Sequence, residues 1–310
     1  MKFIQISDFK LGQSIHGFYL CKEKHIRYTR SGDLFLDMIF SDATGVIDGK
    51  LWDMADHFNE RFRSGDPVAV KGKVTVYKEK LQITVTNINL ANNQKYGKYG
   101  FDPDKIILTV DEPLDVLWRK IMFSINSLDN PHKQLIRSIF HVHKQKICNI
   151  PLSIYHHHPI RGGFLKSLVT MTEISVIILP YYPSLDKNLV ISGILLLKIG
   201  MIKSINDEMQ PNYTEAGKML GQAALGLEIL KEAALSINNF PENLLLKLEH
   251  IIFSRKGRSG DEGLQAPCFP EALFVHHIEG LDDGLALMKD VINNDLNLKW
   301  IDGQDQFQVE

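Results

Sequence analysis

The stretch FSDATGVIDGKLWD, residues 40–53, decides the fold of the first third of the chain. A turn, residues 42–45, precedes a run in which apolar and polar residues alternate. Alternation with a period of two is typical of a half-buried β-strand. One set of side chains is expected to point into the core: Ile47, Gly49 and Leu51. The other set is expected to face the open side: Asp48, Lys50 and Trp52.

The same period continues on both sides of this stretch. It predicts strands over residues 14–22, 33–40, 45–52, 67–77 and 81–90. Apolar residues at helical spacing predict one helix within residues 53–63. Five short strands with a helix after the third are the layout of the OB-fold, so residues 1–98 are expected to form a five-stranded OB-fold β-barrel.

The open side of the predicted barrel favours nucleic-acid binding as its function. Phosphates require cations and unstacked bases require flat apolar surfaces, so a basic face with aromatic side chains suits a single strand of RNA or DNA. The candidate residues are Phe18, Lys24, Arg27, Arg30, Phe35, Lys50, Trp52, Lys73, Tyr77 and Lys80. Two alternatives stay open for single residues: the lysines only solubilise the strands, and Trp52 caps the barrel or packs on the second domain.

The charge distribution agrees with an anion-binding first domain. Residues 1–98 contain 15 Lys and Arg against 11 Asp and Glu, a net charge of +4, and residues 99–310 contain 20 against 26, a net charge of −6. The 44% hydrophobic and 23% charged residues are those of an ordinary globular protein.

Cysteine usage and hydropathy indicate the compartment. The three cysteines form no CxxC pair, which is typical of a reducing environment. No apolar run reaches the ~18 residues of a membrane span. We expect a cytoplasmic protein without a membrane partner.

Beyond a linker-like segment, residues 92–103, the period becomes helical. The pattern predicts an all-helical domain over residues 99–310. Its expected helices are residues 114–123, 131–143, 163–179, 189–199, 215–234, 242–253 and 270–291. The complete chain is therefore expected to be a multi-domain α+β protein.

The helical part contains the phrases HHPIRGGFLKSL, LDKNLVISGILLLKIGMI, YTEAGKMLGQ, IIFSRKG and VHHIEGLDD. In this order, and behind an OB domain, they resemble the YhaM-type exoribonucleases. Those bacterial enzymes trim single-stranded RNA or DNA from the three-prime end with an HD-type metal-dependent phosphohydrolase domain. The resemblance runs from about Gly12 to the region of Asp282, and it implies an HD-like domain.

The resemblance also implies a degenerate metal site. The family's metal-binding positions are occupied here by Ser167, Leu197, Lys198, Gln222, Arg255 and Lys256, and only an acidic residue, Glu279 or Asp282, remains. Leucine, lysine, serine and arginine do not ligate a divalent metal at neutral pH. We therefore expect a catalytically inactive relative that binds single-stranded nucleic acid and needs no cofactor.

Two alternatives to this function remain. One is a metal-dependent 3′–5′ exonuclease or phosphohydrolase with a divalent metal such as Mn at a site rebuilt from His157, His158, His276 and Asp282. The other is a protein-interaction scaffold. Exposed apolar helix faces also leave homo-oligomerisation open.

Lys198 lies inside the apolar run ISGILLLKIG, residues 191–200. An unpaired buried ammonium group is costly, so a partner is required. We expect Lys198 to be buried and to replace a metal cation by pairing with Glu279 or Asp282.

Overall fold

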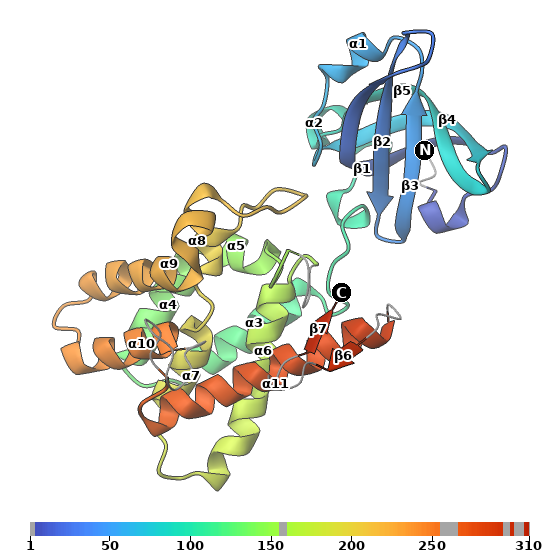
Figure 1. Cartoon of the computed structure of the whole chain (residues 1–310). Helices are drawn as coiled ribbons and strands as arrows, with labels where there is room; N and C mark the ends of the chain where they lie inside the picture. Colours follow the sequence, from blue (N-terminus) through green and yellow to red (C-terminus); the bar gives the residue numbers. More distant parts are fainter. Residues whose placement is uncertain (1–3, 155–159, 255–265, 294–297, 301–306, 310) are drawn as a thin grey trace. The chain divides into compact units, whose positions relative to one another are not determined.

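The computed structural model describes residues 4–154, 160–254, 266–293, 298–300 and 307–309. Figure 1 shows a β-barrel unit and a helical unit. The first unit comprises residues 1–109 together with 208–210, and the second comprises residues 110–207 and 211–310. The barrel unit thus includes the segment that follows residue 98.

The first unit is a closed five-stranded barrel with the order β1-β2-β3-β5-β4. Its strands are β1 (Ser14–Tyr28), β2 (Leu34–Asp42), β3 (Gly45–Leu51), β4 (Pro67–Tyr77) and β5 (Lys80–Leu90). All neighbours pair antiparallel except β3 and β5, which are parallel. Helix α1 (Ala55–Asn59) follows β3, and a short 3₁₀ turn, Ile6–Asp8, precedes β1 (Figure 1). The predicted OB-fold barrel is confirmed.

Strand β1 belongs to two sheet pairings. It pairs with β4 from Ser14 to Leu20 and with β2 from Leu20 to Tyr28, with a bulge between Cys21 and Glu23. Because a bulge bends and twists a strand, β1 can serve both sides of the barrel. Its inward side chains join the buried core together with those of the other strands, including Ile15, Tyr19, Leu36, Met38, Phe40, Leu51, Val74 and Ile83.

Gly49 has a packing reason for being a glycine. It lies in the inward row of β3, and a Cβ atom built there would overlap the ring of Phe40. The aromatic ring therefore fills the space that a side chain at this position would need.

The segment after β5 packs on the barrel. It contains α2 (Asn93–Tyr96) and two 3₁₀ turns, Gly97–Tyr99 and Pro103–Lys105. Phe101 and Ile106 form a small buried cluster with Phe18 and Ala91, and Tyr96 is packed against it. The residues that the sequence presents as a linker thus cover part of the outer barrel surface.

The second unit is largely helical (Figure 1). Its helices are α3 (Leu114–Asn126), α4 (His132–Val142), α5 (Lys144–Asn149), α6 (Gly163–Ile178), α7 (Lys187–Leu196), α8 (Met201–Ser204), α9 (Glu215–Leu235), α10 (Glu242–Ser254) and α11 (Pro270–Asn293). The predicted helices are present, whereas the short α5 and α8 were not predicted. A two-stranded antiparallel hairpin, β6 (Leu298–Trp300) and β7 (Phe307–Val309), contradicts the all-helical prediction for this region.

Helices α6 and α7 form the centre of the helical unit. Every residue of α7 from Leu189 to Leu196 is buried. Residues 163–181 are also long and apolar enough to cross a membrane, but 56% of that window is buried inside the protein. A core helix passes the same length and composition test, so this is weak evidence for a membrane span.

Candidate nucleic-acid interface

The outer surface of β3 has the predicted alternation. Ile47, Gly49 and Leu51 are buried, whereas Asp48 is exposed and Lys50 is half-buried. Trp52, directly after the strand, is 44% exposed. The period-two pattern therefore assigned the open side of this strand correctly.

Trp52 stacks on Phe35 of β2. The two ring centroids are 4.5 Å apart and the ring planes meet at 27°. The pairing of Leu36 with Leu51 places Phe35 beside Trp52 in the register of β2 and β3. Phe35 is only 8% exposed, so it supports the indole from the protein side. The result is a flat, partly exposed aromatic surface whose position is fixed by a second ring.

Two cations flank this aromatic pair because one carboxylate binds both of them. The Nε atom of Arg27 lies 2.7 Å from Oδ2 of Asp37, and the Nζ atom of Lys50 lies 3.0 Å from Oδ1 of the same residue. Lys50 Nζ is also 5.4 Å from the centroid of the Phe35 ring. Together, Arg27, Phe35, Asp37, Lys50 and Trp52 form what we call the Trp52 face, with a net charge of +1.

Asp37 was missed by the sequence analysis. It lies on the outward side of β2, directly opposite Lys50 in the antiparallel register. In the run DLFLDMIF the alternation that places Phe35 outward also places Asp37 outward, which is the signal that was available.

Two predicted binding residues lie elsewhere. Phe18 is 6% exposed because it contacts Phe101 and Tyr96, with ring centroids at 5.2 Å and 5.7 Å, so its ring presents no open surface to a base. The Nζ atom of Lys24 donates hydrogen bonds to the carbonyl oxygens of Asn59, at 2.8 Å, and of Phe62.

The environment of Lys24 agrees with a structural role. Its ammonium lies 4.7 Å from the centroid of the Phe62 ring, and desolvation by burial lowers its pKa. Lys24, a predicted nucleic-acid-binding residue, therefore anchors the end of the α1 segment through these two carbonyl groups.

The remaining predicted residues lie on neighbouring strands and turns. Arg30 is exposed in the turn between β1 and β2, and Lys73 is exposed on β4. Tyr77 is 57% exposed at the end of β4, opposite Lys80 in the register of β4 and β5. In OB-folds these two turns flank the surface of strands 2 and 3 that meets oligonucleotides. The structure thus joins Arg27, Phe35, Lys50 and Trp52 directly, and it leaves the others at the margins.

A second charge cluster lies in the helical unit, where Lys198 and Glu279 are buried and Asp283 is partly exposed. Lys198 is 3% exposed, and its Nζ atom lies 3.4 Å from Oε1 of Glu279 and 2.5 Å from Oδ1 of Asp283. The expected burial of Lys198 and its pairing with Glu279 are confirmed. Asp282 does not fill the alternative role, because it accepts a hydrogen bond from the Ser167 hydroxyl at 2.5 Å. The second carboxylate beside Lys198 is Asp283, which was not predicted.

The described residues around Lys198 do not form a set of ligands for a divalent metal. The Lys198 ammonium lies between the carboxylates, and the neighbouring Leu197 is buried and apolar. Gln222 is half-buried on α9. Within the part of the chain that the structure describes, no group of three or more His, Cys, Asp or Glu side chains has an arrangement that would bind a metal.

Several predicted residues lie outside the described part of the chain. These are His157, His158, Arg255 and Lys256. Of the histidines proposed for a rebuilt site, only His276 is described, on α11, where its ring centroid lies 5.6 Å from that of His277.

The comparisons with known proteins concern the barrel region of the chain. The family model for the "OB-fold nucleic acid binding domain" (tRNA anti-codon) matches residues 23–91. Among solved structures, the second OB-fold domain of replication protein A from Methanococcus maripaludis has 23% identity over 29% of this chain and 96% of that chain, with a TM-score of 0.25. The mitochondrial single-stranded DNA binding protein Rim1 from S. cerevisiae has 17% identity over 30% and 97%, with a TM-score of 0.22. Structural likenesses at this level do not bear on function.

Proposed function

We propose that this chain binds single-stranded RNA or DNA through the Trp52 face of its OB barrel. The observation that carries the proposal is the Trp52–Phe35 stack flanked by Arg27 and Lys50. The match of residues 23–91 to a family of OB-fold nucleic-acid-binding domains supports it. An unstacked base would stack on the exposed side of the Trp52 indole, and the two cations would bind the adjacent phosphates.

The second part of the proposal is that the helical unit is an HD-like domain without hydrolase chemistry. Metal-assisted cleavage requires imidazole or carboxylate ligands that bind the ion and activate water. The place between Glu279 and Asp283 is taken by a lysine ammonium, which offsets one of their two negative charges without ligating a metal. On this proposal the cluster has a structural role.

Substitution of Trp52 tests the binding site. Each base stacked on an aromatic side chain contributes about 1–3 kcal/mol, so Trp52→Ala should weaken binding of a fluorescent single-stranded oligonucleotide roughly 5- to 150-fold. Trp52→Phe should retain most of the affinity because it keeps a flat ring. The measurement is a fluorescence-anisotropy titration with RNA and DNA strands of the same sequence.

Tyr181→Ala is the matched control, because Tyr181 is an aromatic residue that is 80% exposed in the helical unit. It should leave the affinity unchanged. Equal affinities for the wild type and Trp52→Ala, with both chains folded by circular dichroism, would refute the binding site.

A nuclease assay tests the inactive helical unit. End-labelled single-stranded RNA should remain intact after incubation with the full chain in excess Mn²⁺. A ladder of shortened products that chelator abolishes would instead support the alternative, a metal-dependent exonuclease with a rebuilt site.

A further inference from the structure

One segment of the acidic helical unit is purely basic. Residues 130–172 contain six Lys and Arg and no Asp or Glu. Residues 99–310 as a whole contain 20 Lys and Arg against 26 Asp and Glu, so the remainder has 14 against 26, a net charge of −12. A charge distribution this uneven produces a local positive potential in a negative domain.

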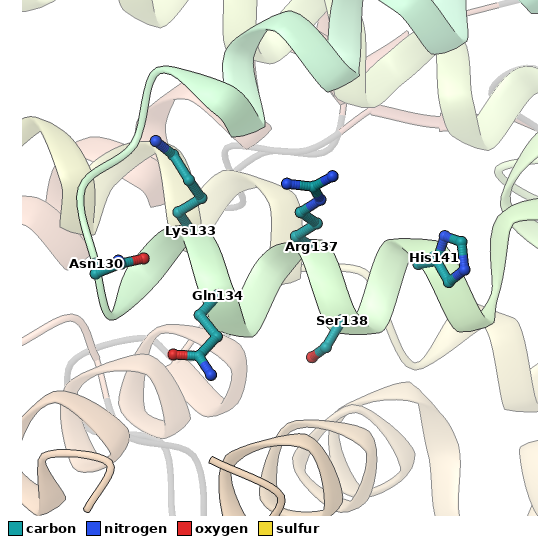
Figure 2. Close-up of a pocket in the computed structure, with 6 residues that line it drawn as sticks. All are labelled: Asn130, Lys133, Gln134, Arg137, Ser138 and His141. Atoms are coloured by element: carbon teal, nitrogen blue, oxygen red, sulfur yellow. The ribbon is translucent and has the colours of Figure 1, made fainter. Parts of the chain in front are cut away.

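Helix α4 presents this charge in a regular row. Lys133, Arg137 and His141 are spaced four residues apart, so they lie one above another on one side of the helix. Figure 2 shows Lys133 and Arg137 extending from the same side of α4. These three residues line a hollow of about 630 Å³ together with Asn130, Gln134 and Ser138.

The row has a rigid support. The opposite side of α4 is buried in the main core of the helical unit through Leu135, Ile136, Ile139 and Phe140. Arg137 and His141 are exposed and Lys133 is half-buried. The exposed Lys144 of α5 follows, with its ammonium 5.2 Å from the centroid of the Trp118 ring. We call Lys133, Arg137, His141 and Lys144 the basic α4 face.

The charges around this face differ from those around other lysines of the unit. Among the described residues, Lys133, Arg137 and Lys144 form no ion pair with a carboxylate. Other lysines of the unit do: Lys120 and Lys166 both pair with Glu112, and Lys203 pairs with Glu228. Like charges four residues apart destabilise a helix slightly. A row of unpaired cations therefore has a small energetic cost that an external polyanion would remove.

We propose that the basic α4 face binds the phosphate backbone of a single-stranded nucleic acid. Four residues of helix rise about 6 Å, a step comparable with the spacing of successive phosphates along an extended strand. The Arg137 guanidinium matches a phosphate with two parallel hydrogen bonds, and the amide groups of Asn130 and Gln134 can donate further ones. The contacts are to the backbone, so binding here is independent of sequence.

This surface is separate from the Trp52 face and adds a second contact area to the protein. The choice of single-stranded nucleic acid as the polyanion rests on the proposed function of the barrel. An acidic protein segment is the competing occupant, and the experiment distinguishes the two.

The test is the salt dependence of binding by the full chain. Each phosphate contact to a single strand contributes about 0.7 to the slope of log K against log salt, so Lys133→Ala/Arg137→Ala should reduce the slope for a long oligonucleotide by about 1.4. The charge-preserving Lys133→Arg/Arg137→Lys should retain the slope. Arg119→Ala/Lys231→Ala is the matched control, because both cations pair with carboxylates elsewhere in the unit and their loss should change nothing.

The same pair of substitutions is also made in the Trp52→Ala chain, which separates the two proposals. If Lys133→Ala/Arg137→Ala reduces the salt-dependence slope both in the wild-type chain and in the Trp52→Ala chain, the result supports the basic α4 face. This holds even if Trp52→Ala alone has no effect and the barrel proposal fails. An unchanged slope in both backgrounds overturns the basic α4 face. The proposal is also overturned if the chain binds polyglutamate in a way that depends on Arg137 while its oligonucleotide binding does not. That result would favour an acidic protein segment as the occupant.

Discussion

Two of the charge clusters in this protein have opposite compositions. In the barrel, one carboxylate, Asp37, binds two cations, Arg27 and Lys50. In the helical unit, one ammonium, Lys198, lies between two carboxylates, Glu279 and Asp283. Their environments also differ. The side chains of Arg27, Asp37 and Lys50 are 60%, 23% and 20% exposed, whereas those of Lys198 and Glu279 are 3% and 5% exposed and only Asp283, at 39%, reaches solvent.

This difference in burial separates two uses of charge. A partly exposed cluster interacts through water, so each pair contributes little to stability and its excess charge is available to a ligand. A buried cluster has lost its hydration, and removing one partner leaves an uncompensated charge in the core. The net charge of a cluster is thus a guide to binding only where solvent reaches it.

The largest effect is expected at the buried cluster. Lys198→Met should lower the free energy of unfolding by about 3–5 kcal/mol, because the buried Glu279 carboxylate would lose the ammonium that lies 3.4 Å from it. Urea denaturation followed by circular dichroism measures this. Adding Glu279→Gln should recover part of the loss, since the buried charge is then removed with its partner.

Lys231→Met is the control for that substitution. Its pair with Glu249 spans 3.4 Å at the surface, with the lysine side chain 57% exposed, so its loss should cost less than about 1 kcal/mol. A loss of that small size for Lys198→Met as well would show that burial does not distinguish the two kinds of cluster.

A smaller effect is expected at His132, a buried residue that forms no ion pair with any residue described in the structure. Burial lowers its pKa, and its Nδ1 atom lies 2.9 Å from the Ser192 hydroxyl. The unfolded chain then takes up the proton first as the pH falls below about 6.5. Stability should therefore fall from pH 6.5 towards the lowered pKa of the folded state, by at most about 1.4 kcal/mol per pH unit.

His132→Asn should remove the part of the acid destabilisation that comes from His132. Above pH 7 this part is absent from the wild type and from the variant. Burial also lowers the pKa values of His143 and His250, so part of the acid destabilisation should remain in the variant. Identical pH profiles of the unfolding midpoint for the two chains would contradict the prediction.

The smallest effect is expected at Asp37. Asp37→Asn should change stability by less than about 1 kcal/mol, because its ion pairs are partly exposed. Nucleic-acid binding should become tighter at low salt, since Arg27 and Lys50 lose their competing anion. Anisotropy titrations at two salt concentrations measure this, and weaker binding would show that Asp37 contributes more by positioning the cations than it costs by neutralising them.

The alternation of apolar and polar residues was sufficient to predict the barrel. Strand β4 has the predicted bounds, and β2, β3 and β5 differ from theirs by at most two residues. Strand β1 extends to Tyr28, beyond the predicted end at residue 22. The reason is the bulge after Cys21, because the extra residue interrupts the alternation while the strand continues along β2.

Contacts between residues that are far apart in the sequence were harder to predict than the strands. Alternation assigns Phe18 to the outer side of β1, but it does not reveal that Phe101 covers that position. Glu279 and Asp283 are four residues apart on α11 and so share one side of the helix, a signal that was present in the sequence. The rotation of α11 that brings Asp283 instead of Asp282 to Lys198 depends on tertiary packing, which a single sequence does not specify.

The burial of the cysteines has a practical consequence for labelling this protein. Cys21 is fully buried in the barrel and desolvation raises the pKa of its thiol to about 12, while burial also raises the pKa of the half-buried Cys148. Cys268 is exposed, with its Sγ atom 4.0 Å from Nδ1 of His250. Because thiol reactions require an accessible thiolate, a maleimide dye should attach first at Cys268. The native chain therefore accepts a fluorophore on its helical unit without any engineered cysteine.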